Sequence, residues 1–159
     1  MNIDLLCVGK LKEKYLLEAI KEYSKRLSRY CKLNIIEVAD EKTPEDQGEL
    51  LNEKVKKLEG ERILKYIKDN SFLITLEIDG SQLESTEFAG RIKDICIRGY
   101  SHIQFVIGGS LGLSEEVTGK ADMHLSFSKM TFPHQLMRVI LLEQIYRCFR
   151  INYSEPYHK

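Results

Sequence analysis

The sequence predicts an α/β fold, with a mainly parallel sheet covered by helices on both faces. Short apolar runs alternate with longer segments of helical periodicity along the whole chain. The apolar runs are nearly continuous, which is typical of parallel strands that are buried on both faces. No internal repeat, linker or low-complexity stretch divides the 159 residues. We therefore expect one domain over residues 1–159.

Each expected strand is an apolar run that ends at glycine, aspartate or a polar turn. The five expected strands are 3–8, 33–39, 72–78, 102–107 and 122–127. Apolar residues at helical spacing predict helices over 12–29, 47–58 with a continuation over 61–68, 85–98, a short segment from about 114, and 133–150.

Local signals suggest where some of these elements begin and end. Thr43 and Pro44 suit the N-cap and first position of the second helix. Gly60 predicts a break in that helix, and Asp79-Gly80 predicts a turn that ends the third strand.

The charge balance bounds the class of partner. Lys plus Arg and Asp plus Glu are 24 each, which argues against nucleic-acid binding by overall charge alone. Residues 10–32 are locally basic, with eight Lys or Arg against three Glu. This stretch is either a solvated helix face or a surface that contacts phosphates.

The chain carries no sign of export, membrane insertion or metal binding. No signal-peptide pattern opens the sequence, and no apolar stretch is long enough to span a bilayer. Cys7, Cys31, Cys96 and Cys148 lack zinc-site spacing and sit among apolar neighbours. We expect four reduced, buried thiols, a cytoplasmic protein and no metal.

The loops after Leu76, Ile107 and Phe127, at the carboxyl ends of three expected strands, are predicted to form a small-molecule pocket, because ligands of open α/β sheets bind there. The turn after Ile107 reads GGSLG, which is not a dinucleotide fingerprint and is either a tight turn or a close backbone approach to a flat ligand. The loop 127–132 mixes polar and apolar residues. It suits an aromatic ligand with polar edges, or it is an ordinary loop in which Thr131 caps the last helix.

The last predicted helix is apolar over most of its surface. Its polar residues share one arc, namely Glu143, Gln144, Arg147 and Arg150. Such a helix is expected to be buried against both the sheet and a second subunit. Arg138 falls on the apolar side, where it either escapes to solvent or serves as a buried pairing or substrate residue. His134 is interpreted as a capping or packing residue rather than a catalytic one.

The segments FVIGGSLGL, LSFSKMTFPHQLMRVILLEQIYR and the terminal YHK together closely resemble the RlmH family of SPOUT-class methyltransferases, also known as the YbeA family. The similarity includes the opening IDLLCVGKLK and spans essentially the whole chain. The resemblance implies a C-terminal trefoil knot, with a knotted, cofactor-binding part over about 72–159. It also implies a homodimer that methylates N3 of a pseudouridine in helix 69 of 23S rRNA.

The resemblance assigns residues to this activity. The contacts with S-adenosylmethionine would be Leu76, Gly108, Phe127, Ser128, Lys129, Met130, Thr131 and Phe132. Tyr157 and His158 would be catalytic, with His158 assisting proton removal or steadying the imide anion. Arg138 and Lys159 would contact the RNA. The alternatives are a SPOUT enzyme that acts on tRNA and a non-catalytic nucleotide- or RNA-binding module.

Overall fold

The computed structural model describes residues 1–43 and 48–157 and confirms the α/β fold class. Its strands are β1 (Asn2–Val8), β2 (Lys32–Val38), β3 (Phe72–Gln82), β4 (His102–Ile107) and β5 (Met123–Ser126). Its helices are α1 (Lys14–Leu27), α2 (Glu49–Leu64), α3 (Ser85–Ile97), α4 (Glu115–Thr118) and α5 (His134–Asn152). Among the described residues, no helix is long and apolar enough to cross a membrane.

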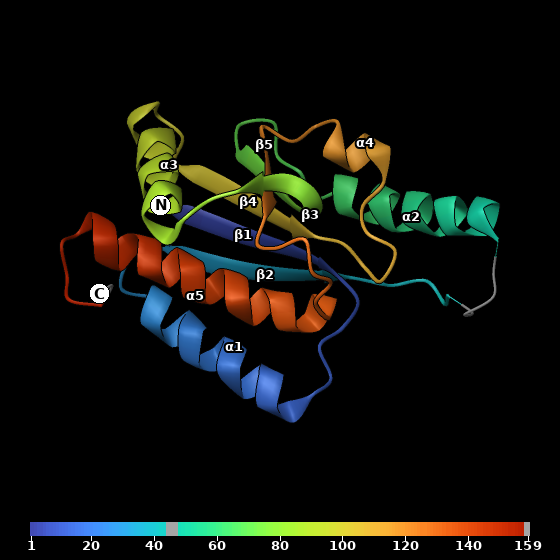
Figure 1. Cartoon of the computed structure of the whole chain (residues 1–159), viewed down its shortest axis with the longest axis horizontal. Helices are drawn as coiled ribbons and strands as arrows, with labels where there is room; N and C mark the ends of the chain where they lie inside the picture. The colour runs from blue at the N-terminus through green and yellow to red at the C-terminus, as the bar shows by residue number, and fades with distance from the viewer. Residues whose placement is uncertain (44–47, 158–159) are drawn as a thin grey trace.

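The five strands form one parallel sheet in the order β2-β1-β4-β3-β5. β1 and β4 run in continuous register from Asn2 opposite His102 to Cys7 opposite Ile107. Because every pair is parallel, the carboxyl ends of the strands lie together at one edge. Two walls of a site can therefore come from β3 and β4, which are adjacent in the sheet and separated by α3 in the chain (Figure 1).

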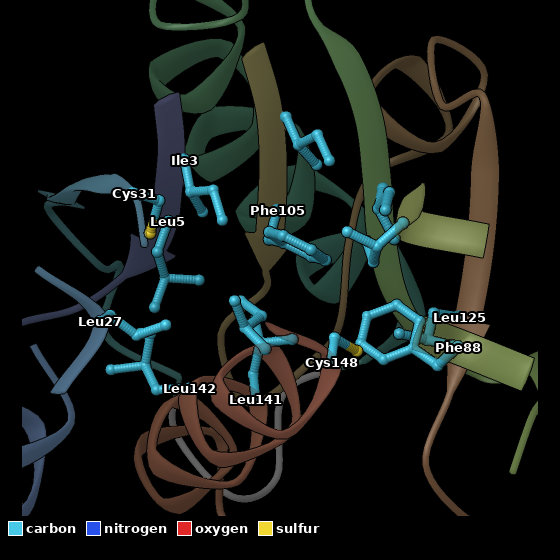
Figure 2. Packing of buried hydrophobic residues seen from close by; sticks show 14 of the residues in the cluster. Ile3, Leu5, Leu27, Cys31, Phe88, Phe105, Leu125, Leu141, Leu142 and Cys148 are labelled. Atoms are coloured by element: carbon cyan, nitrogen blue, oxygen red, sulfur yellow. The ribbon is translucent and has the colours of Figure 1, made fainter. Parts of the chain in front are cut away.

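One face of the sheet is covered by α1, α3 and α5, and it holds the larger apolar cluster. Leu27, Phe88 and Leu141 pack from these three helices against strand residues such as Leu5 and Phe105. Figure 2 shows Leu141 of α5 below Phe105, and Leu142 beside Leu27 of α1. Side chains that are removed from water in this way supply the main favourable term in folding.

The opposite face is covered by α2 and α4 (Figure 1) and holds a smaller cluster. Ile63 of α2 and Val117 of α4 pack there on Leu6, Leu73 and Val106. Strand positions two residues away from these also face this side, and they bury the polar side chains Asp4, Thr75 and Gln104, so this face is mixed in character.

The structure departs from the sequence prediction in α2. This helix is continuous through Gly60, where a break was predicted, and it begins at Glu49 with Gly48 in the N-cap position rather than Thr43. Pro44 lies outside the described residues. Gly60 has a packing role, because a Cβ there would come within 2.2 Å of the Ser114 hydroxyl oxygen. A glycine inside a helix is tolerated where close packing requires it.

Two further predictions are wrong in detail. The third strand does not end at Asp79-Gly80 but continues to Gln82, with an irregularity in its pairing with β5 between Leu76 and Ser81. Cys96 is exposed on α3, although Cys7, Cys31 and Cys148 are buried as predicted. The apolar neighbours of Cys96 in sequence do not share its face of the helix, because a helix turns about 100° per residue.

Candidate functional site

A cavity of about 740 Å³ opens at the carboxyl ends of β3, β4 and β5, beside the first turn of α5. Its lining comes from the end of β3, the turn after β4, and the stretch that leads from β5 into α5. The lining residues are Leu76, Glu77, Ile78, Asp79, Ile107, Gly108, Gly109, Ser110, Leu111, Gly112, Leu113, Leu125, Phe127, Ser128, Met130, Thr131, Phe132, Pro133, His134 and Met137. This is the sheet edge that the sequence indicated.

Most of the predicted cofactor residues lie in this one cavity. Leu76, Gly108, Phe127, Ser128, Met130, Thr131 and Phe132 all line it. Lys129 is exposed and is not among the lining residues. The structure thus brings together the three strand ends at which the sequence predicted the pocket, without Lys129.

The glycine turn forms one wall of the cavity by close approach of backbone to backbone. A Cβ on Gly108 would lie 2.7 Å from the carbonyl carbon and oxygen of Gly112. Gly112 adopts a φ of 86°, a left-handed conformation that favours glycine. Gly109 and Gly112 form an isolated antiparallel bridge that closes the turn. A flat ligand can therefore approach a wall made largely of backbone.

The opposite wall, formed by the loop 127–132, is held by two serine side chains. The Ser126 hydroxyl donates to the carbonyl of Ile78 at 2.8 Å and is 3.1 Å from the carbonyl of Ser128. The amide of Met130 donates to the Ser128 hydroxyl at 3.0 Å. These bonds tie the loop to the end of β3 and fix its backbone, while the side chains of Met130 and Phe132 remain exposed.

Two carboxylates of the lining, Glu77 and Asp79, were not identified from the sequence as site residues. The Glu77 carboxylate accepts a hydrogen bond from the Thr75 hydroxyl at 2.9 Å and contacts the imidazole of His124. The sequence signal that could have identified Glu77 and Asp79 is their position at the end of an otherwise apolar strand. Two acidic groups at the rim of an apolar cavity favour a ligand that carries positive charge.

His134 lines the cavity at the start of α5. Burial and the nearby positive charge of Arg138 lower its pKa below 6.5, against a smaller opposing effect of Asp40. Both of these causes favour the neutral imidazole. Its place in the first turn and its half-buried position agree with the packing interpretation, and the lining position gives it contact with a ligand.

Arg138 is 1% exposed and forms the buried pairing that the sequence left open as one alternative. Its guanidinium donates to the Glu37 carboxylate at 2.7 Å and to the carbonyls of Val8 and Gly9 at 2.9 and 2.8 Å. These bonds fix the start of α5 on the ends of β1 and β2. The RNA contact predicted for Arg138 stays a prediction, and it would require the guanidinium to leave these acceptors.

The described part of the C-terminal tail, residues 153–157, lies on the α1 side of α5 and contributes no residue to the cavity lining. The Tyr157 hydroxyl donates to the Glu143 carboxylate at 2.8 Å, and the Arg147 guanidinium lies 4.7 Å from the centre of the Tyr157 ring. Burial and the negative Glu143 raise the pKa of Tyr157, so its phenol remains protonated. His158 and Lys159, also predicted as site residues, lie outside the described residues.

The Glu143 carboxylate also affects a second phenol, that of Tyr23. Burial and Glu143 raise the pKa of Tyr23 on α1 to about 12. Closer to the end of α5, Glu155 contacts both Arg150 and the hydroxyl of Tyr30, and Arg150 also donates to the carbonyl of Pro156 at 3.1 Å. The tail is thus bound to α1 and α5 up to Tyr157.

The comparisons with known proteins agree with this geometry. A family described as predicted SPOUT methyltransferase matches residues 1–158, so the chain belongs to that family of methyl-transferring enzymes. Over the full length of both chains, it is 63% identical to "Ribosomal RNA large subunit methyltransferase H" of Bifidobacterium animalis subsp. lactis strain AD011. The protein of the same name from Clostridium novyi strain NT is 60% identical over the same span.

A solved structure extends the likeness to the fold. "The structure of a probable methylase family protein from Haemophilus influenzae Rd KW20" superposes with a TM-score of 0.54, over 99% of this chain and 70% of that chain. At 14% identity this supports the fold alone. The trefoil knot that the resemblance implies stays a prediction.

The cavity suits the methyl donor that this family implies. Its walls offer apolar side chains for a ring, such as Leu76 and Phe127, and backbone groups of two loops for polar ring edges. Glu77 and Asp79 complement a positively charged donor. Among residues 1–43 and 48–157, no group of His, Cys, Asp or Glu side chains is arranged to hold a metal ion.

Proposed function

We propose that the chain uses S-adenosylmethionine to methylate N3 of a pseudouridine in helix 69 of 23S rRNA, on assembled ribosomes. The observation that carries this proposal is the full-length identity of 60–63% to proteins named as large-subunit rRNA methyltransferases. It is supported by the cavity, in which seven of the eight predicted cofactor residues lie together.

Within the cavity, each wall has a distinct task. The apolar side chains of Leu76, Phe127 and Met137 take the adenine ring and exclude water from it. The backbone of the loop 127–132 provides hydrogen bonds to the ring edges, and Glu77 or Asp79 faces the cationic end of the donor. When bound, the donor supplies a methyl group that is already activated for transfer.

The acceptor nitrogen must lose a proton during transfer. The imide of pseudouridine is weakly acidic, so positioning and a modest base are sufficient for catalysis. His158 is the residue proposed to assist proton removal or to stabilise the imide anion, with Tyr157 orienting it and Lys159 contacting phosphate. Glu143 holds the Tyr157 phenol in a fixed, protonated state.

The separate positions of tail and cavity support a homodimer. The Tyr157 contacts described above are on α1 and α5, whereas the cavity is at the first turn of α5. A second copy packed on α5 could place its tail at the cavity of the first. Leu136, Val139 and Ile140 of α5 are partly exposed and belong to neither apolar cluster, which supplies an apolar contact surface for that copy.

The substrate also sets the expected compartment and surface. A ribosomal substrate places the protein in the cytoplasm. With zero formal charge overall, contacts with rRNA phosphates would depend on local basic segments such as residues 10–32. A structured ribosomal particle, rather than free RNA, is therefore the expected substrate.

The test is transfer of radiolabelled methyl groups from S-adenosylmethionine to three substrates in parallel, namely assembled ribosomes, isolated large subunits and bulk tRNA. We expect label in rRNA of assembled ribosomes, and none in ribosomes from cells that lack pseudouridine in helix 69. Label in tRNA alone would overturn the proposed substrate. Absence of both transfer and donor binding would favour a non-catalytic binding module.

A variant test addresses the tail. His158→Ala is expected to bind S-adenosylmethionine as the wild type does and to lose about 10²-fold or more of the transfer rate, the usual contribution of a general acid or base. Full turnover of this variant on ribosomes would remove His158 from the reaction.

A further inference from the structure

The glycine wall of the cavity is supported from behind by α2, an element with no predicted role in the site. Glu59 of α2 approaches Gly109, and Gly60 of α2 packs on Ser114, the residue that precedes α4. Thr43, which precedes α2 in the chain, adds a contact in which its hydroxyl lies 3.4 Å from the hydroxyl of Ser110. Gly109 and Ser110 line the cavity, so these contacts lie one layer behind the ligand.

Glu59 is the unusual member of this set. Its side chain is buried, at 4% exposure, although it is a carboxylate on a long and mostly charged helix. Oε1 accepts a hydrogen bond from the amide of Glu41 at 2.9 Å. Oε2 is buried and has no hydrogen-bond partner in the part of the chain that the structure describes.

The partnerless oxygen is directed at the turn. A Cβ on Gly109 would lie 2.9 Å from Oε2 of Glu59 and 3.2 Å from a methyl carbon of Val8. Gly109 is therefore held between α2 and the end of β1, with no room for a side chain. A buried polar atom without a partner costs free energy, and such a cost is retained where the group has another role.

Burial has the largest effect on the pKa of Glu59. Burial raises its pKa above the ordinary value, and the carboxylates of Asp40 and Glu41 add to this. The amide of Glu41 and the guanidinium of Arg62 act in the opposite direction. Glutamine has nearly the same shape as glutamate and keeps a polar side chain, which makes Glu59→Gln a close replacement.

From this geometry we propose that Glu59 is a positioning residue for the methyl-donor pocket, which fixes the glycine wall by its contact with Gly109. The inference rests on the proposed function, because it names the donor pocket as the site whose shape is controlled. Glu59 does not line the cavity itself. Glu59 affects the affinity for the donor by positioning the glycine turn, and it does not contact the reacting atoms.

The test measures binding of S-adenosylmethionine by calorimetry and the transfer rate at saturating donor on ribosomes. Glu59→Ala is expected to weaken donor binding about tenfold, as a small displacement of a binding wall does, with the saturated rate within about twofold of wild type. Glu59→Gln is expected to restore near wild-type affinity. Glu61→Ala, at an exposed position of the same helix, is the matched control.

A double-mutant cycle tests whether the effect passes through Gly109. Gly109→Ala alone is expected to weaken donor binding, because its new methyl group meets Oε2. In the Glu59→Ala background, the same substitution is expected to cost less, since only the contact with Val8 remains. Additive effects of the two substitutions would overturn the proposed route.

The outcomes separate this inference from the proposed function. If the wild type binds donor and Glu59→Ala binds it equally well, the positioning role is wrong and the enzyme assignment stands. If the wild type binds no donor, the assignment itself fails. Should Glu59→Ala not fold, Glu59→Asp keeps the carboxyl group and withdraws it from Gly109, and wild-type affinity in that variant would overturn the inference.

Discussion

The two faces of the sheet bury different kinds of side chain. The face under α1, α3 and α5 is a continuous apolar cluster that includes Phe105, Leu141 and Cys148. The face under α2 and α4 has a smaller apolar cluster. It also buries polar groups, among them Asp4, Thr75 and Gln104 on the strands and Glu59 on α2.

This difference indicates a division between the faces, in which one contributes mainly to stability and the other mainly to the geometry of the site. Apolar burial is non-directional and contributes most to stability, whereas buried polar groups need specific partners and so fix specific geometry. On the mixed face, Asp4 fixes the amino end of the sheet, and Glu59 lies behind the pocket at the carboxyl end. Substitutions on each face test this division, and one in the C-terminal tail tests whether the tail is separate from the pocket.

The largest expected effect is on the apolar face. Leu141→Ala should lower the free energy of unfolding by about 2–5 kcal/mol, because it opens a cavity in a fully buried site. Ile63→Ala is the matched change on the other face, equally buried in the smaller cluster. Denaturant unfolding measures both. A loss at Ile63 as large as that at Leu141 would contradict the division.

The regular features of both faces could be predicted from the sequence. The apolar runs located all five strands, and their carboxyl ends located the pocket, because periodicity and parallel pairing are local or general rules. The prediction of where elements end was wrong at two glycines. Gly60 and Gly80 read as breaks, but each is a glycine at a close approach to another segment, Ser114 and the backbone of β5 respectively.

The features of the site that the sequence did not predict depend on contacts between distant segments. Glu59 reads as one charge among many on α2, and its burial follows only from the position of the glycine turn. The pairing of Arg138 with Glu37 joins residues 101 positions apart. The position of Tyr157 depends on the Ser154 backbone, at a φ of 55°, and on Glu143. No pattern in the sequence encodes these contacts.

The second prediction concerns acid stability on the mixed face. Asp4 is fully buried and bonds Asn34, Lys68, His102 and Gln104. Although burial alone would raise its pKa, these hydrogen bonds and positive charges hold it below the ordinary value of 3.8.

Because the folded pKa of Asp4 is depressed, its stabilisation is present above pH 3.8 and is lost as the pH falls through the folded value. Asp4→Asn should therefore be less stable than wild type near neutral pH, by about 1–3 kcal/mol for disrupted buried bonds. The difference should shrink below pH 3.8. Urea unfolding from about pH 7 to about pH 2 measures it, and a gap that is constant over this range would refute the ionised role of Asp4.

The third prediction separates tail from pocket. Tyr157→Phe removes one hydrogen bond to Glu143, so it should change stability by about 1 kcal/mol or less. We expect unchanged donor affinity and a lower transfer rate on ribosomes, the reverse of the pattern expected for Glu59→Ala. Tyr153→Phe, at an exposed position, is the control. Weaker donor binding by Tyr157→Phe would show that the tail belongs to the donor site.

The smallest effect is expected at Cys96, the exposed thiol outside the apolar cluster. Cys96→Ser should change the free energy of unfolding by less than about 0.5 kcal/mol. Native protein should be alkylated first at Cys96. Burial protects the other three thiols, raising the pKa of Cys7 and Cys148 to about 12 and that of Cys31 to about 11.

All three protected thiols belong to the apolar cluster, so their labelling rate reports how often that face opens. If the apolar face carries most of the stability, Cys148 in the Cys96→Ser variant should be labelled only as fast as the whole protein unfolds, because both the thiol and its neighbours must leave the core. Mass spectrometry of timed samples, set beside the unfolding rate, measures this. Labelling of Cys148 well ahead of global unfolding would mean that α5 detaches locally, and that the stable part of the molecule is not the face under α1, α3 and α5.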